Sequence, residues 1–194
     1  MSKQTKKTTT IAMLTAIAAV LITLVHFPLF PAAAFLQYDP ADVAILIGAF
    51  AYGPLAGSII TVLASAIQAF LLGGDGVYGF LMHSIASGVL AVTAGSIYRQ
   101  WHTRKGAAAA LSVGTLAMGF VMMVANHFIT PMFMGAPVAV VDAMLLPVIL
   151  PFNLLKAGIN SVITFLVYKT VSRHVIHGEG WEKKMIGGKV ENDC

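Results

Sequence analysis

The sequence predicts an all-α integral membrane protein with six transmembrane helices and both termini in the cytoplasm. Three observations predict this class. Of the 194 residues, 58% are hydrophobic and only 10% are charged, and the mean hydropathy is +0.84, whereas soluble domains carry about 25% charged residues. Apolar runs of about 20 residues, the length that crosses a bilayer, recur along the chain. The basic residues stand in separate clusters between these runs.

The placement of the basic residues predicts the orientation. Of the 12 Lys and Arg, three precede the first helix, three lie between the fourth and fifth helices, and five stand at the end of the sixth helix or in the tail. By the positive-inside rule, both termini are cytoplasmic. The four acidic residues upstream of the tail then lie on the outer side: Asp39, Asp42, Asp75 and Asp142. Because the basic residues form no single patch, a nucleic-acid partner is not expected.

The first predicted helix covers residues 8–27. Its apolar run is longer than the 7–15 residues of a signal-peptide core, which favours a retained helix. Ala12 and Ala16 form a small-xxx-small pair, which allows a second helix to approach closely. A loop with three prolines follows, and we expect this loop, with Asp39 and Asp42, to lie outside the bilayer core.

The remaining helices follow from apolar runs and the breaks between them. A short helix at residues 45–53 ends at the Gly-Pro step, and longer helices are predicted at 54–72, 77–98 and 107–129. A proline-interrupted connection at 130–150 leads to the sixth helix, which ends near residue 170. We therefore expect one six-helix domain over residues 1–172, and a polar, disordered cytoplasmic tail over 173–194.

Lys156 is the only basic residue inside a long apolar segment, where a charge costs roughly 2.5 to 3.5 kcal/mol. Helical spacing puts Asn153, Lys156 and Asn160 on one stripe. In one interpretation the lysine snorkels and the asparagines only join helices, but the shared face favours contact with a ligand. With no carboxylate expected inside a helix, the predicted partners of the ammonium are ligand acceptors, amide oxygens or water.

Further polar residues are predicted at the same depth, in the outer half of the membrane. They come from different helices: Gln68, His83, Asn126 and His127, in addition to Asn153 and Lys156. Side chains that only join helices would scatter with depth, so the pattern indicates a cavity open to the outside, with aromatic residues such as Tyr38 as candidate walls. For His83, His127 and Gln68, an ordinary contact between helices is the alternative.

The sequence does not predict an enzyme. No helix is expected to hold a carboxylate base, and no His and Glu residues have the spacing of metal ligands, so neither a metal site nor a cofactor is predicted. The single cysteine, Cys194, excludes an intrachain disulfide. The chain has no phosphate-binding loop, so energy for the uptake of a solute would come from another protein.

Several segments resemble a known family, the substrate-binding subunits (S components) of energy-coupling factor (ECF) vitamin transporters, and most closely its riboflavin-specific group. The matching pieces, which together cover roughly residues 8–172, are Ala12-Met-Leu-Thr-Ala16, residues 38–57, Arg104-Lys105-Gly106, Asn126-His-Phe and residues 149–169. The Asp-x-x-Asp-Val and Pro-Phe-Asn-x-x-Lys pieces are fairly specific in combination.

The resemblance implies a six-helix binder in the cell membrane that captures a vitamin from outside. It also implies partners, namely a transmembrane coupling subunit and two ATPase subunits. Asn126, Asn153 and Lys156 match ligand-contacting positions of the group, and Ala12 and Ala16 match its docking motif for the coupling subunit. Two pairs depart from the riboflavin pattern, because Ser65-Ala66 replaces Lys-Asn and His83-Ser84 replaces Asn-Phe.

The sequence therefore predicts a substrate-binding subunit of an ATP-driven vitamin importer, with riboflavin as the first candidate. The candidate ligand-binding residues are Tyr38, Gln68, His83, Asn126, Asn153, Lys156 and Asn160. An unpaired Lys156 argues against cationic solutes and favours a neutral or weakly anionic heterocycle. Two alternatives remain open, a different vitamin or vitamin precursor, and a membrane scaffold or channel-like protein.

Overall fold

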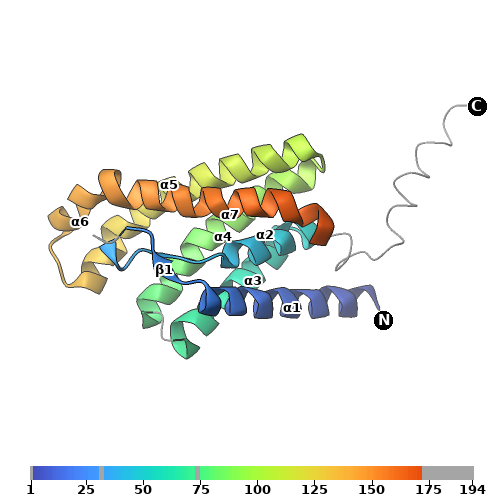
Figure 1. Ribbon diagram of the computed structural model, residues 1–194, viewed down its shortest axis with the longest axis horizontal. Helices are drawn as coiled ribbons and strands as arrows, with labels where there is room; N and C mark the ends of the chain where they lie inside the picture. Colours follow the sequence, from blue (N-terminus) through green and yellow to red (C-terminus); the bar gives the residue numbers. More distant parts are fainter. Residues whose placement is uncertain (1, 31–32, 73–74, 172–194) are drawn as a thin grey trace, which may run out of the picture.

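The computed structural model describes residues 2–30, 33–72 and 75–171, which form an elongated bundle of helices (Figure 1). The α-helices are α1 (Lys3–Leu24), α2 (Ala41–Tyr52), α3 (Pro54–Ala66), α4 (Gly76–Gln100), α5 (Arg104–Met134), α6 (Val138–Met144) and α7 (Leu150–Val171). Two π-helical turns, η2 (Ile67–Leu71) and η3 (Leu145–Ile149), follow α3 and precede α7. Strands β1 (Phe27–Pro28) and β2 (Gln37–Tyr38) form an antiparallel pair. The predicted tail, 173–194, lies outside the described residues.

The helices confirm the predicted membrane fold. Within the described ranges, five helical segments are long and apolar enough to cross a membrane. One of these, Val138–Tyr168, runs through α6, η3 and α7 without a break. The shorter apolar helix α2 is the sixth, so the chain is an all-α, multi-pass membrane protein.

The predicted break between the second and third helices lies at Gly53. Its φ of 90° is a left-handed conformation that glycine adopts without a steric penalty. Pro54 then occupies the first position of α3, where its missing N–H costs nothing. Residues 41–50 of α2 are all buried. A Cβ added to Gly57 of α3 would lie 2.8 Å from the Ala49 Cβ, so a glycine is needed where these two helices meet.

The proline-interrupted connection predicted at residues 130–150 is largely helical in the structure. Helix α5 continues to Met134 with Pro131 inside it, and α6 and η3 fill most of the remaining segment. Pro147 lies within the π-helical turn η3. Membrane helices tolerate proline because neighbouring helices and local π adjustments satisfy the freed backbone groups. The proline signal therefore marks irregular turns here and does not end the helical path.

The two ends of the bundle differ in charge. The start of α1, the turn between α4 and α5, and the end of α7 lie at the same end of the molecule (Figure 1). Lys6, Lys7, Arg104 and Lys105 are in these segments, while the segment with Asp142 lies at the opposite end. This is the arrangement that the predicted orientation requires.

Candidate functional site

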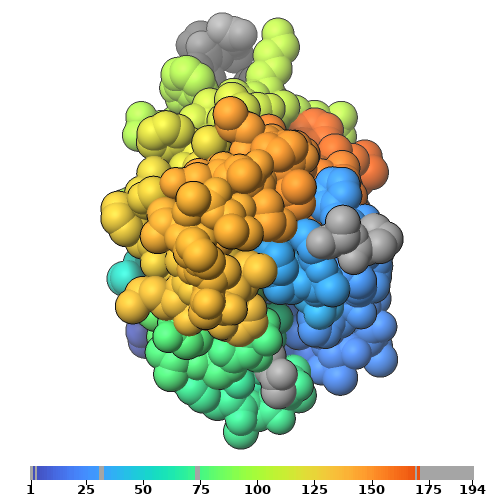
Figure 2. All heavy atoms as spheres, turned by 90° about the vertical axis from the view of Figure 1, so that its left-hand side faces the viewer, coloured from blue at the N-terminus to red at the C-terminus, as the bar shows by residue number. Residues whose placement is uncertain are grey.

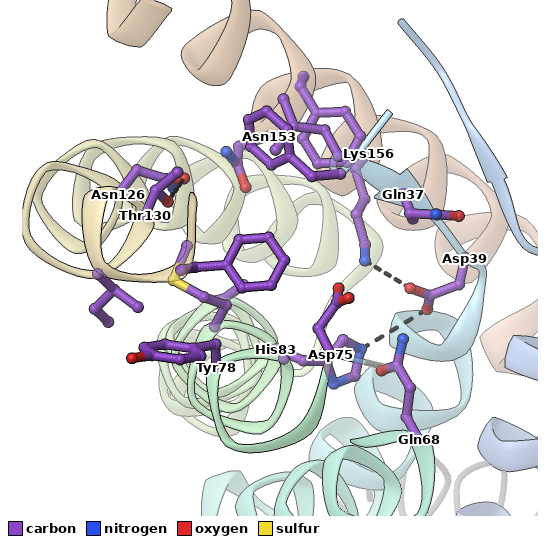
Figure 3. Close-up of a pocket in the computed structure, with 18 of the residues that line it drawn as sticks. Gln37, Asp39, Gln68, Asp75, Tyr78, His83, Asn126, Thr130, Asn153 and Lys156 are labelled. Atoms are coloured by element: carbon purple, nitrogen blue, oxygen red, sulfur yellow. Dashed lines mark hydrogen bonds and ion pairs between the residues drawn. The ribbon is translucent and has the colours of Figure 1, made fainter. Parts of the chain in front are cut away.

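A pocket lies at the end of the bundle opposite the basic clusters. Figure 2 looks onto this end, where α6, the start of α4 and the connection after α1 meet. The polar side chains that line the pocket are Gln37, Asp39, Gln68, Asp75, His83, Asn126, Thr130, Asn153 and Lys156. Apolar lining residues include Phe35, Tyr78, Met82, Met118, Phe133 and Phe152. Figure 3 shows many of these side chains pointing into one space from several helices.

Most of the predicted site residues meet in this pocket. Gln68 comes from η2, His83 from α4, Asn126 from α5, and Asn153 and Lys156 from α7. The predicted convergence of these side chains is confirmed, while their role in binding stays a prediction. His127 does not line the pocket, because its ring faces Asp142 of α6 with 38% of the side chain exposed.

Tyr38 and Asn160 lie behind the pocket wall and not on its surface. The Tyr38 hydroxyl donates to Asn160 Oδ1 at 3.0 Å, and Asn160 Nδ2 donates to the backbone oxygen of Asp39, also at 3.0 Å. Asn160 is fully buried. These two residues thus tie α7 to the segment that leads into α2, and they position groups that face the pocket.

The partner of Lys156 is a carboxylate. Its ammonium donates to Asp39 Oδ2 at 2.7 Å, and both side chains are buried. The prediction that only ligand acceptors, amide oxygens or water would bind Lys156 is therefore wrong. The argument against cationic ligands assumed an unpaired Lys156, so it no longer holds. Burial would raise the pKa of the Asp39 carboxyl, but Lys156 and His83 beside it hold that pKa below its ordinary value.

Asp42 is a second buried carboxylate, and it lies in the first turn of α2. Ser87 of α4 donates to its Oδ1, and Asn160 Nδ2 donates to its Oδ2 at 3.0 Å. The expectation that no helix contains a carboxylate is wrong, because Asp42 belongs to α2. The cause is Pro40, which caps α2 and lets the helix begin at Ala41, where an acidic residue suits the positive end of the helix dipole.

His83 is held from both sides. Its Nδ1 lies 2.7 Å from the Ser65 hydroxyl of α3, and its Nε2 lies 3.8 Å from Asp39 Oδ1. The ring therefore joins α3, α4 and the segment before α2. Of the pocket residues, Asp39, His83 and Lys156 form a charged end whose groups bind one another (Figure 3).

An amide end faces the charged end across the pocket (Figure 3). Asn126 Nδ2 donates to the Met122 carbonyl one turn earlier, and Thr130 donates to Asn126 Oδ1 at 2.8 Å. Asn153 Nδ2 likewise donates to the Ile149 carbonyl at 2.8 Å. Each asparagine donates its amide group to a carbonyl one turn earlier, so its position is fixed. Such preorganised polar groups can recognise hydroxyl or carbonyl groups of a ligand without first losing conformational freedom.

The small residues predicted to dock a partner are on the surface. Ala12 and Ala16 of α1 are both exposed. Ala12 also borders an apolar groove with Thr15 of α1 and residues of α3 and η2, among them Leu63 and Phe70. The pair is therefore not used for packing within the described chain, and another helix could approach there.

The sequence did not indicate Asp39, Thr130 or Tyr78 as pocket residues. Asp39 precedes a proline, which is a usual signal for a turn. A usable signal was nonetheless present, because Asp39 and Asp42 lie three residues apart, directly before a helix made of apolar residues. An acidic pair at that position has to be buried with the helix, and a buried carboxylate requires a partner such as Lys156.

Comparisons with known proteins agree with this fold. Residues 6–168 match the family described as ECF transporter, substrate-specific component. The riboflavin transporter FmnP of Bacillus subtilis (strain 168) is 31% identical over 172 residues, which is 84% of this chain and 90% of FmnP. The riboflavin transporter RibU of Staphylococcus aureus (strain TCH60) is 29% identical over 176 residues, 88% of this chain and 92% of RibU.

A solved structure gives the same result for the fold. The S component of a bacterial ECF transporter superposes with a TM-score of 0.77 at 29% sequence identity. The superposition covers 88% of this chain and 97% of the solved one. The agreement therefore extends over most of the chain.

Proposed function

The chain belongs to the family of substrate-specific components of ECF transporters, and from this premise we propose that it captures a heterocyclic vitamin, with riboflavin as the first candidate. The observation that carries the proposal is the pocket at the end opposite the basic clusters, where polar groups and aromatic side chains face one space. Under the positive-inside rule this end faces outward, so the ligand enters from the extracellular side. A scaffold would not need such a pocket.

The two ends of the pocket suit a ligand with two chemical parts. A flat heterocycle can pack against apolar side chains such as Phe152 and Met118, while Asn126 and Asn153 bind a hydroxylated chain. Two relatives of about 30% identity are named riboflavin transporters, which supports the same choice. Riboflavin has both parts, a planar ring system and a chain of hydroxyl groups.

A second candidate is a different vitamin or a vitamin precursor. Two residues favour it, His83 and Ser65, which bind each other. Both stand at positions where the sequence departs from the pattern of the riboflavin-specific group. An ammonium already paired with Asp39 also leaves room for ligands that carry a positive charge. Because of these two observations, the identity of the bound ligand has to be determined by experiment.

The experiment is to purify the protein from cells grown in rich medium and to identify the small molecule released on denaturation. We expect a yellow preparation with flavin fluorescence, and saturable binding of riboflavin to the ligand-free protein at micromolar concentration or below. Asn153→Leu should weaken that binding, while Leu116→Ala, which changes an exposed residue of α5, should not. A colourless protein that does not bind added riboflavin contradicts the choice of riboflavin but not the family.

We propose further that the chain works with a transmembrane coupling subunit and two ATPase subunits, which supply the energy for uptake. The exposed pair Ala12 and Ala16 provides a surface where a partner helix could approach closely. Ala16→Trp should therefore abolish ligand uptake and copurification with the coupling subunit, while the purified protein still binds ligand. Leu116→Trp places the same side chain at an exposed position on α5 and serves as the control. Equal effects of the two substitutions would argue against docking through α1.

A further inference from the structure

Gln68 differs from Asn126 and Asn160 because no described residue binds its side-chain oxygen. Its side chain lines the pocket, yet Oε1 is buried with no hydrogen-bond partner among the described residues. Asn126, Asn153 and Asn160, in contrast, each donate to oxygens of the protein. A buried polar group without a partner costs about 1 to 3 kcal/mol. Such a group at a pocket wall is placed to receive its partner from a ligand.

The backbone around Gln68 is unusual in a way that brings this side chain inward. Gln68 is the only polar residue of η2, the π-helical turn that follows α3. Phe70 and Leu71 of the same turn are 58% and 76% exposed, so these two large apolar side chains face outward. π-Helical turns are rare and occur frequently at functional sites, because the extra residue changes the direction of the side chains. The turn here directs a carboxamide to the pocket.

The neighbours of Gln68 bind one another. His83 contacts Ser65 and Asp39, and Asp39 binds Lys156 and the backbone N–H of Ala41. In Figure 3 the Gln68 carboxamide points toward His83 and Asp39. This wall therefore combines a fixed charged group with one neutral carboxamide whose donor and acceptor can still rotate into place.

We propose that Gln68 determines specificity by binding a paired edge of the ligand, in which a ring N–H stands beside a ring C=O. The Gln68 Nε2 group donates to the ring carbonyl, and Oε1 accepts from the ring N–H. A carboxamide and a lactam or imide edge are planar and complementary. Glutamine and asparagine side chains recognise the edges of nucleobases through the same kind of paired hydrogen bonds. The inference rests on the proposed function and names the part of a heterocyclic ligand that this wall recognises.

The geometry also predicts what the site rejects. A ligand without the ring N–H would leave the buried Oε1 without a partner, and such losses discriminate strongly between substrates. A ligand carboxylate could accept a hydrogen bond from Gln68 Nε2, but it has no donor for Oε1 and would also leave that oxygen without a partner. Heterocycles with a lactam or imide edge, the flavin ring among them, are therefore the substrate class of this wall.

The test compares two probes, riboflavin and its N3-methyl derivative, which lacks only the imide N–H. Wild-type protein should bind riboflavin about tenfold more tightly than the derivative, the scale expected when one hydrogen bond is lost and the buried Oε1 is left without a partner. Gln68→Met keeps the length of the side chain but removes the donor and the acceptor, so it should bind both probes with equal affinity. Phe70→Leu changes an exposed residue of the same turn and should keep the tenfold preference.

The outcomes separate this inference from the proposed function. A wild-type protein that binds neither probe overturns the choice of riboflavin, and this inference with it. Equal binding of the two probes to wild type, or a tenfold preference that persists in Gln68→Met, overturns the inference alone and leaves riboflavin as the substrate. Binding of the N3-methyl derivative reports whether Gln68→Met is folded, and Gln68→Leu repeats the measurement if that variant is not.

Discussion

Two acid–base pairs at the pocket end of the bundle make the same kind of contact but differ in burial. Lys156 and Asp39 join α7 to the segment before α2, and their side chains are 7% and 1% exposed. His127 and Asp142 join α5 to α6, and their side chains are 38% and 42% exposed. We call these the inner pair and the outer pair. Only the inner pair lines the pocket.

The difference lies in what surrounds each pair. Asp39 of the inner pair also accepts from the backbone N–H of Ala41 and lies near His83. Removing one member would leave a charge inside the protein, where water cannot replace the lost partner. Each member of the outer pair is more than a third exposed, so water can take the place of the partner. Burial, more than the distance between the two groups, therefore decides what a pair contributes.

The largest effect is expected from breaking the inner pair. Asp39→Leu leaves the Lys156 ammonium buried without its carboxylate, which should destabilise the protein by about 3 to 5 kcal/mol. Thermal unfolding of the purified protein in detergent, followed by circular dichroism, measures the loss. The variant should unfold at a clearly lower temperature than wild type.

The double variant Asp39→Leu/Lys156→Met is the control for this prediction. It replaces both charges by apolar side chains, and such replacements are often close to neutral. It should therefore recover more than half of the stability lost in Asp39→Leu. A double variant as unstable as the single one would show that Asp39 matters for its contacts with Ala41 or His83 and not for its pairing with Lys156.

The second effect concerns binding at the inner pair. Lys156 Nζ has three donors and gives one of them to Asp39, so two remain for a ligand. Lys156→Met should weaken ligand binding by about 1.5 to 3 kcal/mol, the scale of a hydrogen bond to a charged group. Titration of the folded, monodisperse variant measures the affinity. An affinity equal to that of wild type would remove Lys156 from the binding site.

Much of the fold follows from the sequence because each membrane helix is a local signal of length and hydropathy. The segment around Pro131 and Pro147 does not, because proline breaks helices in water but is tolerated where neighbouring helices satisfy the backbone. The strands at Phe27 and Gln37 were also missed. Each has two residues, which is too short for the alternation that indicates a strand.

The site could be predicted in part for the same reason. Asn153 and Lys156 share a face by helical spacing, which is local, and both line the pocket. The partner of Lys156 is 117 residues away in the sequence, and no local period reports such a pairing. A rule of chemistry could have replaced the missing signal, since a buried ammonium needs an acceptor and Asp39 and Asp42 were the acidic residues beside an apolar helix.

The smallest effect is expected at the outer pair. Exposed pairs contribute about 0 to 1 kcal/mol, because water solvates each group almost as well as the partner does. His127→Ala should therefore change the free energy of unfolding by less than about 1 kcal/mol, in the same detergent assay that is used for Asp39→Leu. Since His127 does not line the pocket, the dissociation constant of the ligand should also stay within about twofold of the wild-type value.

Salt separates the two pairs further. The Debye length, over which dissolved ions screen the interaction between exposed charges, falls from about 10 Å at 0.1 M salt to about 3 Å at 1 M. Buried pairs are screened much less. Any stability difference between wild type and His127→Ala should therefore disappear at high salt, while the difference between wild type and Asp39→Leu should remain. A His127→Ala variant that loses as much stability as Asp39→Leu would show that the contact between α5 and α6 holds the pocket end together. Burial would then no longer explain the contrast between the two pairs.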